Sequence, residues 1–367
     1  MCIKSAFSSK NNLEEAVKDI ESQLKAINPR VVIFFSSSCF DNEKISHLMK
    51  ENFKSSDVFG CTTSGEIISG EMLKNSIVAM ALSSDIIEDV NVEVVEDLNE
   101  NEVKKAFAKF DNYYGESILN SDYSKYLGVI LIDGLSRTEE TIMDVIGDLT
   151  NNLFIGGSAG DDLKFDKTYV FANGRSYTNA AILALLKPKA TFDIIKTQSF
   201  KVLDKKLVAT KVNAKNREVI EFNGIPAVKA YAQAIGVPED KVADYFTSNP
   251  VGLVIDGEIF VRSPQQIKGN SIIFYCSILE GMEISLLEST NIVEDTKSAI
   301  SNQIKEMGNI SGIINFHCIL RTLELEQKNQ TQEYGKIFSD IPTIGFSTYG
   351  EEYLGHINQT STMLVFK

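Results

Sequence analysis

The sequence predicts an α/β protein of repeated strand–helix–strand units, whose strands form mixed sheets with covering helices. Continuous apolar runs, such as Val31–Phe35 and Leu127–Ile132, are typical of strands that are covered on both faces. Stretches with apolar residues at helical spacing alternate with these runs. In the C-terminal half, short apolar runs separated by turn signals predict an added antiparallel portion.

The first unit begins with a helix that Asn11 or Asn12 can cap and that Asn28-Pro29 ends. Its predicted elements are a helix over 13–24, a strand over 31–35, a helix over 43–53, a short strand at 58–59 and a strand over 76–82. The segment Gly60–Glu66 follows the short strand and contains two glycines around hydroxyl residues, which is typical of a sharp turn.

The second unit repeats this plan around a related turn, Gly156–Asp161. Ser136 is the predicted N-cap of its helix, with Glu139 as the capping-box partner. Its predicted elements are a strand over 127–132, a helix over 136–149, a strand over 153–155, and strands over 168–171 and 180–186 joined by a hairpin turn at Asn173-Gly174.

The third unit contains the turn Gly345–Glu351. Its predicted elements are a strand over 310–316, a helical region over 323–338 broken near Gly335, a strand over 342–344 and a strand over 361–366. The antiparallel portion precedes it, with a helix end at 231–238 and strands over 251–255, 259–262 and 272–277. The polar segment 211–217 is the best candidate boundary, so we expect an N-terminal helix over 1–27 and domains over 28–213 and 214–367.

Composition narrows the class of protein. The formal net charge of −14 argues against nucleic acid and anionic membrane surfaces, because both need clustered Lys and Arg. The five cysteines are scattered and match neither a disulfide framework nor a zinc site. The first residues lack a signal peptide, and no apolar run is long enough to span a bilayer. We therefore expect a cytoplasmic protein without membrane insertion.

Together these motifs resemble the FIST domain, in its N-terminal and C-terminal parts, over roughly residues 28–367. The resemblance is carried by Gly60–Glu66, Gly156–Asp161 with Phe171–Gly174, the segment Phe316-x-Cys318-x-x-Arg321, Gly345–Glu351 and His356–Thr360. It implies a bacterial intracellular sensory module that binds a small ligand, with amino acids suggested. No output segment follows the last motif, so we expect the signal to pass to a separate partner, such as a histidine kinase or a chemoreceptor-type protein.

The glycine turns are the first candidates for the binding site. Their backbone N–H groups can hold a carboxylate, and the acids that follow can receive an ammonium group, which suits an amino-acid-like ligand. The alternative is that the turns only shape strand ends and that their acids cap turns or face solvent. The predicted ligand-binding residues are Thr63, Glu66, Ser158, Asp161, Arg321, Tyr349, Glu351 and Asn358.

Arg321 follows a buried-type strand, and ligand crevices of open α/β sheets form at the carboxyl ends of strands. Its guanidinium can hold a carboxylate through two hydrogen bonds. The alternative is a structural ion pair with Glu351 or another acid of the third unit.

Two alternatives to this sensor remain open. The resemblance extends to relatives described as haem-binding nitric-oxide sensors that act on a partner histidine kinase, and His356 would then be the haem ligand. Otherwise we expect neither a cofactor nor a metal site. A second alternative is a cysteine-dependent enzyme that uses Cys61 or Cys318, although buried free cysteines are usually inert. The leading expectation is a binding protein without catalysis.

Overall fold

The computed structural model describes residues 2–367, which form two compact units. The first unit comprises the chain up to Lys196 together with residues 296–356 and 361–367. The second unit comprises residues 197–295 with 357–360. The strands, helices and mixed sheets confirm the predicted α/β class.

The first unit repeats one plan three times along the chain: strand, helix, strand, helix, strand, short hairpin and strand. The first repeat contains β1 (Ile3–Ser8), α1 (Leu13–Leu24), β2 (Val31–Ser37), α2 (Ile45–Asn52), β3 (Asp57–Thr63), β4 (Glu66–Ile68), β5 (Glu71–Leu73) and β6 (Ile77–Leu82). The second contains β7 (Ile87–Glu96), α3 (Glu100–Tyr114), β8 (Leu127–Ile132), α4 (Glu139–Leu149), β9 (Phe154–Ser158), β10 (Val170–Ala172), β11 (Arg175–Tyr177) and β12 (Ala180–Pro188). The third contains β13 (Phe192–Gln198), α6 (Ile292–Met307), β22 (Gly312–Cys318), α7 (Ile319–Gln327), α8 (Thr331–Lys336), β23 (Thr343–Thr348), β24 (Glu351–Tyr353), β25 (His356–Ile357) and β26 (Thr360–Phe366).

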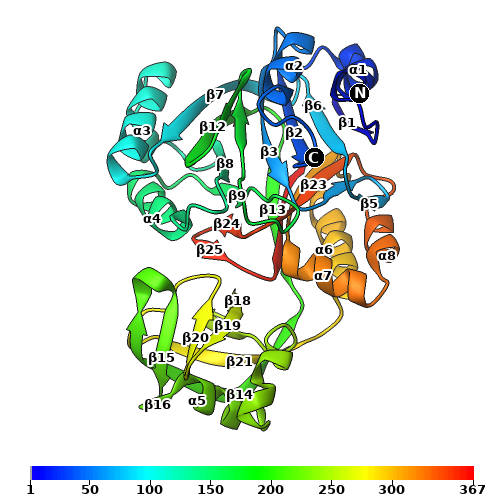
Figure 1. Cartoon of the computed structure of the whole chain (residues 1–367). Coiled ribbons are helices and arrows are strands. Elements are labelled where there is room, and N and C mark those ends of the chain that lie inside the picture. Colours follow the sequence, from blue (N-terminus) through cyan, green and yellow to red (C-terminus); the bar gives the residue numbers. More distant parts are fainter. Residues whose placement is uncertain (1) are drawn as a thin grey trace. The chain divides into compact units, whose positions relative to one another are not determined.

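Each repeat donates its hairpin to the sheet of another repeat. The strand orders are β1-β6-β2-β3-β10-β11, β7-β12-β8-β9-β24-β25 and β13-β26-β22-β23-β4-β5. The sheet of the first repeat therefore receives the hairpin of the second, the second receives that of the third, and the third receives that of the first. Figure 1 shows one of these exchanges, with β24 and β25 in red beside β9. The glycine turns are the points at which the chain leaves one sheet and enters the next.

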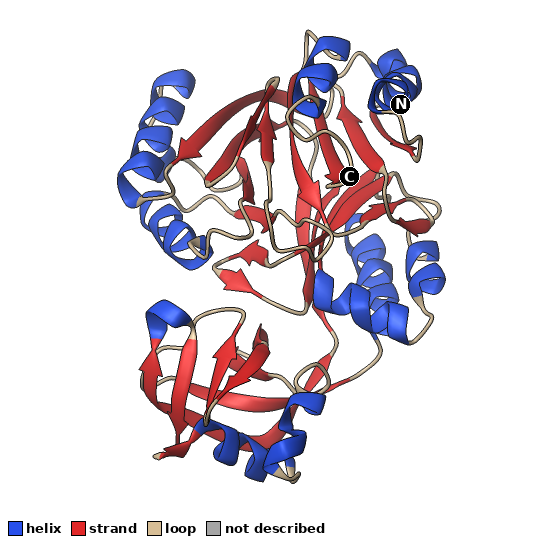
Figure 2. Cartoon of the chain, viewed as in Figure 1, coloured by secondary structure: helices blue, strands red, loops and turns tan. Residues whose placement is uncertain are grey.

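The three sheets of this unit share one apolar core. Phe35 of the first sheet contacts Phe346 of the third with ring centroids 4.5 Å apart, and Leu131 of the second sheet belongs to the same cluster. The other faces of the first and second sheets pack against α1 with α2 and against α3 with α4. Figure 2 shows the helices of this unit on the outside of its sheets.

The second unit is built on one antiparallel sheet, which confirms the predicted antiparallel portion of the C-terminal half. Its elements are β14 (Phe200–Asn213), β15 (Glu218–Phe222), β16 (Ile225–Pro226), α5 (Ala227–Ile235), β17 (Val251–Ile255), β18 (Glu258–Arg262), β19 (Pro264–Lys268), β20 (Ser271–Phe274) and β21 (Glu283–Ser289). Asp256-Gly257 joins β17 to β18 with positive φ at both residues, as a tight hairpin turn requires. The polar segment 211–217 forms the end of β14 and a short 3-10 turn. The domain boundaries at 27/28 and 213/214 stay a prediction.

Three predicted details are wrong. The helix predicted from Ser136 begins at Glu139, because the Ser136 hydroxyl bonds to Thr138 and does not cap the helix. The hairpin turn at Asn173-Gly174 joins β10 to the short β11, while β12 lies in another sheet. The last helical region begins at Ile319 and breaks at residues 328–330, so Gly335 lies inside α8.

Candidate functional site at the junction of the turns

The glycine turns of the three repeats meet and hydrogen-bond to one another. Each turn contains a hydroxyl residue, namely Thr62, Ser158 or Ser347, whose backbone hydrogen-bonds to the turn of another repeat. That other repeat is the one whose hairpin joins the sheet to which the hydroxyl residue belongs. These bonds run from Gly160 N to Thr62 O (2.9 Å), from Tyr349 N to Ser158 O (3.2 Å), from Ser158 N to Gly350 O (2.9 Å), from Ser64 N to Ser347 O (3.1 Å) and from Ser347 N to Gly65 O (2.8 Å). Several of the N–H groups predicted to face a ligand therefore donate to a neighbouring turn in this structure.

The first glycine of each turn is required by close packing and not by a special backbone angle. A Cβ at Gly60, Gly156 or Gly345 would lie 1.9, 1.7 or 2.3 Å from a carbonyl oxygen of the adjacent parallel strand. None of these glycines has a positive φ, whereas Gly65 does, with φ +122°. The shared motif thus marks the place where two strands approach too closely for any side chain.

Glu66 is fully buried at the start of β4. Its carboxylate accepts hydrogen bonds from the Thr63 hydroxyl, from the Ser76 hydroxyl (2.6 Å) and from the Ser76 backbone N–H (3.1 Å). Burial raises its pKa to about 7, although these hydrogen bonds lower it. Glu66 and Thr63 therefore fasten the first turn to the strand that returns from its hairpin.

Asp161 organises the loop after the second turn. Its carboxylate accepts from the backbone N–H groups of residues 165–167 at 2.7–3.1 Å and from the Tyr349 hydroxyl of the third turn. The Tyr349 oxygen in turn accepts from the N–H of Leu163 at 3.0 Å. Burial and the nearby Asp161 carboxylate raise the pKa of Tyr349. Two predicted site residues are thus directly bonded across two repeats.

Ser158 leads to a buried pair that the sequence analysis did not single out. The Ser158 hydroxyl donates to Oε1 of Glu352 (3.2 Å), and the same oxygen lies 3.0 Å from Nδ1 of His356. Within residues 2–367, the other carboxylate oxygen, Oε2, has no hydrogen-bond partner although Glu352 is fully buried. Burial lowers the pKa of His356, but Glu352, Glu139 and Glu140 together raise it to about 9. The contact with Glu352 therefore favours the protonated form of the His356 imidazole.

Arg321 lies in the first turn of α7 and is almost fully buried. Its guanidinium donates to the Thr296 hydroxyl of α6 at 3.1 Å. The next residue, Thr322, shares a hydrogen bond of 2.7 Å with the Ser347 hydroxyl of the third turn. Glu351 is also fully buried, where β24 pairs with Gly157.

The structure thus brings most of the predicted site residues to the first unit, around one junction. These are Thr63, Glu66, Ser158, Asp161, Tyr349 and Glu351, with Arg321 on the helix next to the third turn. Asn358 belongs to the second unit, where both polar atoms of its buried amide lack a partner among residues 2–367. The sequence signal for Glu352 was its place beside Glu351, four residues before His356.

The residues present do not fit a haem ligated by His356. The imidazole is bonded to Glu352, which favours its protonated form, and its Cε1 packs against Gly350, where a Cβ would lie only 1.9 Å away. Iron needs a neutral imidazole nitrogen that faces an open site. Among the described residues, no cluster of three or more His, Cys, Asp or Glu side chains could hold a metal ion.

The structure gives little support to a cysteine-dependent enzyme. Cys61 is fully buried, and burial raises its pKa well above that of a free thiol. Cys318 is also buried, as the residue that precedes α7. A thiol nucleophile requires the opposite environment, one that is accessible and lowers the pKa.

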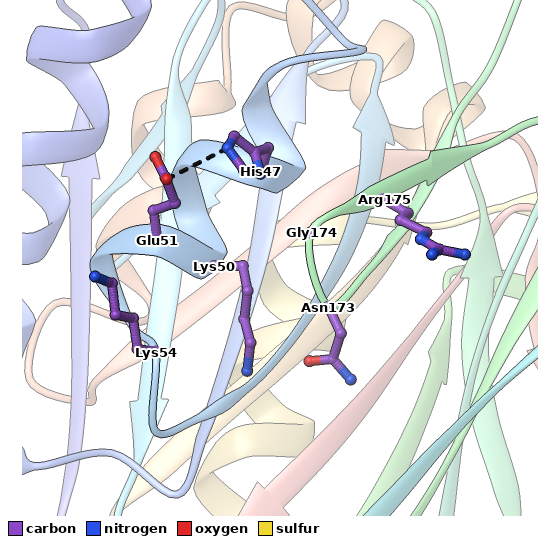
Figure 3. Close-up of a pocket in the computed structure, with 7 residues that line it drawn as sticks. All are labelled: His47, Lys50, Glu51, Lys54, Asn173, Gly174 and Arg175. Carbon is purple, nitrogen blue, oxygen red and sulfur yellow. Dashed lines mark ion pairs between the residues drawn. The ribbon is translucent and has the colours of Figure 1, made fainter.

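A surface hollow of about 420 Å³ lies where the hairpin turn Asn173–Arg175 meets α2. Figure 3 shows His47 and Lys50 on the helix facing this turn, with His47 paired to Glu51 at 3.4 Å. A second hollow of about 500 Å³ occupies the corresponding place between α4 and Leu354. The two hollows lie at equivalent positions of two repeats, so they are a consequence of the repeated fold. The cationic side chains that line the first hollow are mostly exposed. We therefore place the candidate site at the buried junction of the turns.

The fold and the junction define a class of protein: a three-repeat α/β unit with exchanged hairpins, into which an antiparallel unit is inserted. The family model described as FIST N domain matches residues 30–225, and that described as FIST C domain matches residues 227–353. The chain belongs to the FIST family, whose domains are ligand-binding sensory modules of signal transduction.

The chain is also similar to an uncharacterized protein of Methanocaldococcus jannaschii. The two are 23% identical over 311 residues, which are 79% of this chain and 60% of the relative. This chain therefore covers less than two thirds of the length of that relative. Within residues 2–367, no helix combines the length and the apolar character needed to cross a membrane.

Proposed function

We propose that this chain is a sensor of a small amino-acid-like ligand, which passes its signal to a separate partner protein. Membership of the FIST family supports the sensory role. The single observation that carries the ligand class is the state of Glu352, a buried carboxylate with one oxygen that no described residue satisfies. A buried carboxylate oxygen without a partner is costly, and a ligand ammonium group would remove that cost.

The ammonium group would bind at Glu352, beside Ser158 and His356. Glu66 and Asp161 are less suited to it, because hydroxyl and backbone donors already occupy their carboxylates. The carboxylate of the ligand would bind at Arg321. Thr63, Tyr349 and Glu351 remain candidates for contacts to the rest of the ligand, while Asn358, in the second unit, stays a prediction from the sequence.

A thermal-shift screen over the twenty amino acids and their amines tests this function. Ligand binding to the folded state raises the melting temperature by mass action. We expect a hit whose shift is lost in Glu352→Gln, and kept in Glu71→Gln, an exposed acid on the hairpin of the first repeat. Hits that survive both Glu352→Gln and Arg321→Lys would contradict the proposed site, and an absence of hits would contradict the ligand class.

The partner would be a histidine kinase or a chemoreceptor-type protein, a class that follows from the family alone. Ligand binding would shift a pre-existing equilibrium between two conformations that the partner distinguishes. The test compares autophosphorylation of a candidate kinase with the chain alone and with the chain plus the amino acid hit. Equal kinase activity under both conditions would contradict coupling to that partner.

A further inference from the structure

The third repeat carries a buried polar layer where the other two repeats are largely apolar. The register of the parallel strands makes Asn315 equivalent to Phe34 and Ile130, because each pairs with the first glycine of a turn. By the same register His317 is equivalent to Ser36 and Ile132. Ser361, which pairs with His317, stands where the other repeats have Ile77 and Ala181.

The first two repeats show that this fold needs no buried polar network at these positions. In them the equivalent residues pack mostly in apolar clusters beneath the helices, and Phe34 stacks on Phe171 with centroids 5.3 Å apart. Burying imidazole, amide and guanidinium groups costs free energy that an apolar layer avoids. The first two repeats therefore serve as an internal comparison for the third. They indicate that the polar layer of the third repeat has a role other than stabilising the fold.

Hydrogen bonds link the side chains of this layer from Ser361 to His317. The Ser361 hydroxyl donates to Oδ1 of Asn315 (2.7 Å), and Nδ2 of Asn315 donates to the Tyr334 oxygen of α8 (3.1 Å). The Tyr334 hydroxyl lies 2.9 Å from Nδ1 of His317, and since its oxygen already accepts from Asn315, we assign its proton to this bond. In this assignment His317 carries its own proton on Nε2.

That Nε2–H group is the end of the chain of donors, and it has no partner among residues 2–367. His317 is fully buried, so bulk water does not serve as the acceptor. Burial, and then the positive charge of Arg321, lower the pKa of His317 well below its usual value, which keeps the ring neutral. A neutral N–H donor beside a guanidinium favours an acceptor that carries negative charge.

We infer that the polar layer of the third repeat binds the carboxylate group of the ligand, with Nε2–H of His317 donating to it beside Arg321. This inference rests on the proposed function and adds to it a second donor that the sequence analysis left without a role. Tyr334 and Asn315 are positioning residues, since they hold the imidazole in the tautomer that donates. The chemistry selects a planar carboxylate, because two donors from neighbouring groups can share its two oxygens.

Nitrogen NMR of histidine-labelled protein tests this assignment, with sodium acetate as the probe. The chain has three histidines, so His47→Gln and His356→Gln assign the spectrum by elimination. We expect His317 as the neutral Nε2–H tautomer at pH 6, and its signals should shift with acetate while those of the exposed His47 do not. An Nδ1–H tautomer, no response to acetate, or an equal response to sodium chloride would each overturn the assignment.

Two variants check the role of the layer. His317→Gln should weaken acetate binding about tenfold, the effect of losing one hydrogen bond. Tyr334→Phe should release the fixed tautomer and weaken acetate binding in the same direction, and it serves if His317→Gln fails to fold. Acetate affinity that is unchanged in a folded variant of either kind would overturn the inference.

The outcomes separate this site from the proposed function. If acetate shifts His317 but no amino acid raises the melting temperature, the carboxylate site stands and the amino-acid-like ligand falls. If an amino acid binds, with its effect lost in Glu352→Gln and the His317 signals unmoved, the proposed function stands and the carboxylate site falls.

Discussion

The backbone of Gly350 lies against the imidazole of His356, so that a Cβ on Gly350 would stand 1.9 Å from Cε1 and 2.8 Å from Nε2. The same ring bonds to Glu352 through Nδ1. Gly350 therefore provides the space in which a buried ion pair can form next to the third turn. The last glycine of this motif has a role in the site and not only in the turn.

Gly350→Ala should displace His356 from Glu352 and so lower its pKa from about 9 toward the usual value of 6.5. An NMR pH titration of the histidine signals measures this shift directly. The exposed His47 supplies the internal reference, since its environment is unchanged. A His356 midpoint that stays near its original value would contradict the steric role given to Gly350.

Gly60→Ala should destabilise the protein by about 3 kcal/mol or more, because the new methyl group meets a backbone oxygen that cannot move without breaking the strand pair. Gly147→Ala is the matched control. Gly147 lies in α4, where a new Cβ would meet no atom within 4 Å apart from its chain neighbours and the backbone of its own helix, so alanine should stabilise the helix by about 0.5–1 kcal/mol. Urea unfolding of both variants decides the point, and equal effects would show that the packing argument is wrong.

The sequence predicts the elements that a continuous apolar run or a strong cap defines. Helix α1 with its Asn12 cap and strand β8 are found as predicted. Strand β7 was missed, because polar residues, mostly acids, alternate with its valines and leave no continuous apolar run. The exchange of hairpins could not be predicted, since Asn173-Gly174 specifies a local turn but not the sheet that the hairpin joins.

Glu66→Gln should remove a pH dependence of stability. The pKa of Glu66 is about 7 in the folded protein against 4.5 for a free carboxyl, so the folded state binds more protons between these values. Stability is therefore highest below pH 4.5 with respect to this group, falls by about 3 kcal/mol as the pH rises to 7, and is constant above that. The amide of glutamine resembles the protonated acid.

Urea unfolding of wild type and Glu66→Gln at pH 5 and pH 8 measures this effect. The wild type should lose more stability than the variant between the two pH values. Glu71→Gln, at the exposed first residue of β5 in the same hairpin, controls for the loss of a surface charge. A Glu66→Gln variant with an unchanged pH dependence would show that Glu66 is ionised at little cost.

The sequence predicted the parts of the candidate site in which a motif recurs. It did not predict the part in which the third repeat differs from the other two. The glycine turns led to Ser158 and Asp161, which do meet the third turn. His317 was passed over, because its meaning depends on the register that aligns it with Ile132 of another repeat. Such an alignment needs the structure, since the repeats share little sequence outside the turns.

Tyr349→Phe should loosen the loop after the second turn without disturbing the sheets. The Tyr349 hydroxyl donates to Asp161 and accepts from the backbone of Leu163, so its removal takes a partner from each. We expect a loss of about 1–2 kcal/mol and faster hydrogen exchange over residues 161–167. Tyr123→Phe, with a side chain that is 70% exposed, is the control. The Tyr349 hydroxyl joins the turns of two repeats. Unchanged hydrogen exchange over residues 161–167 in Tyr349→Phe would therefore contradict the stabilising role given to this hydroxyl.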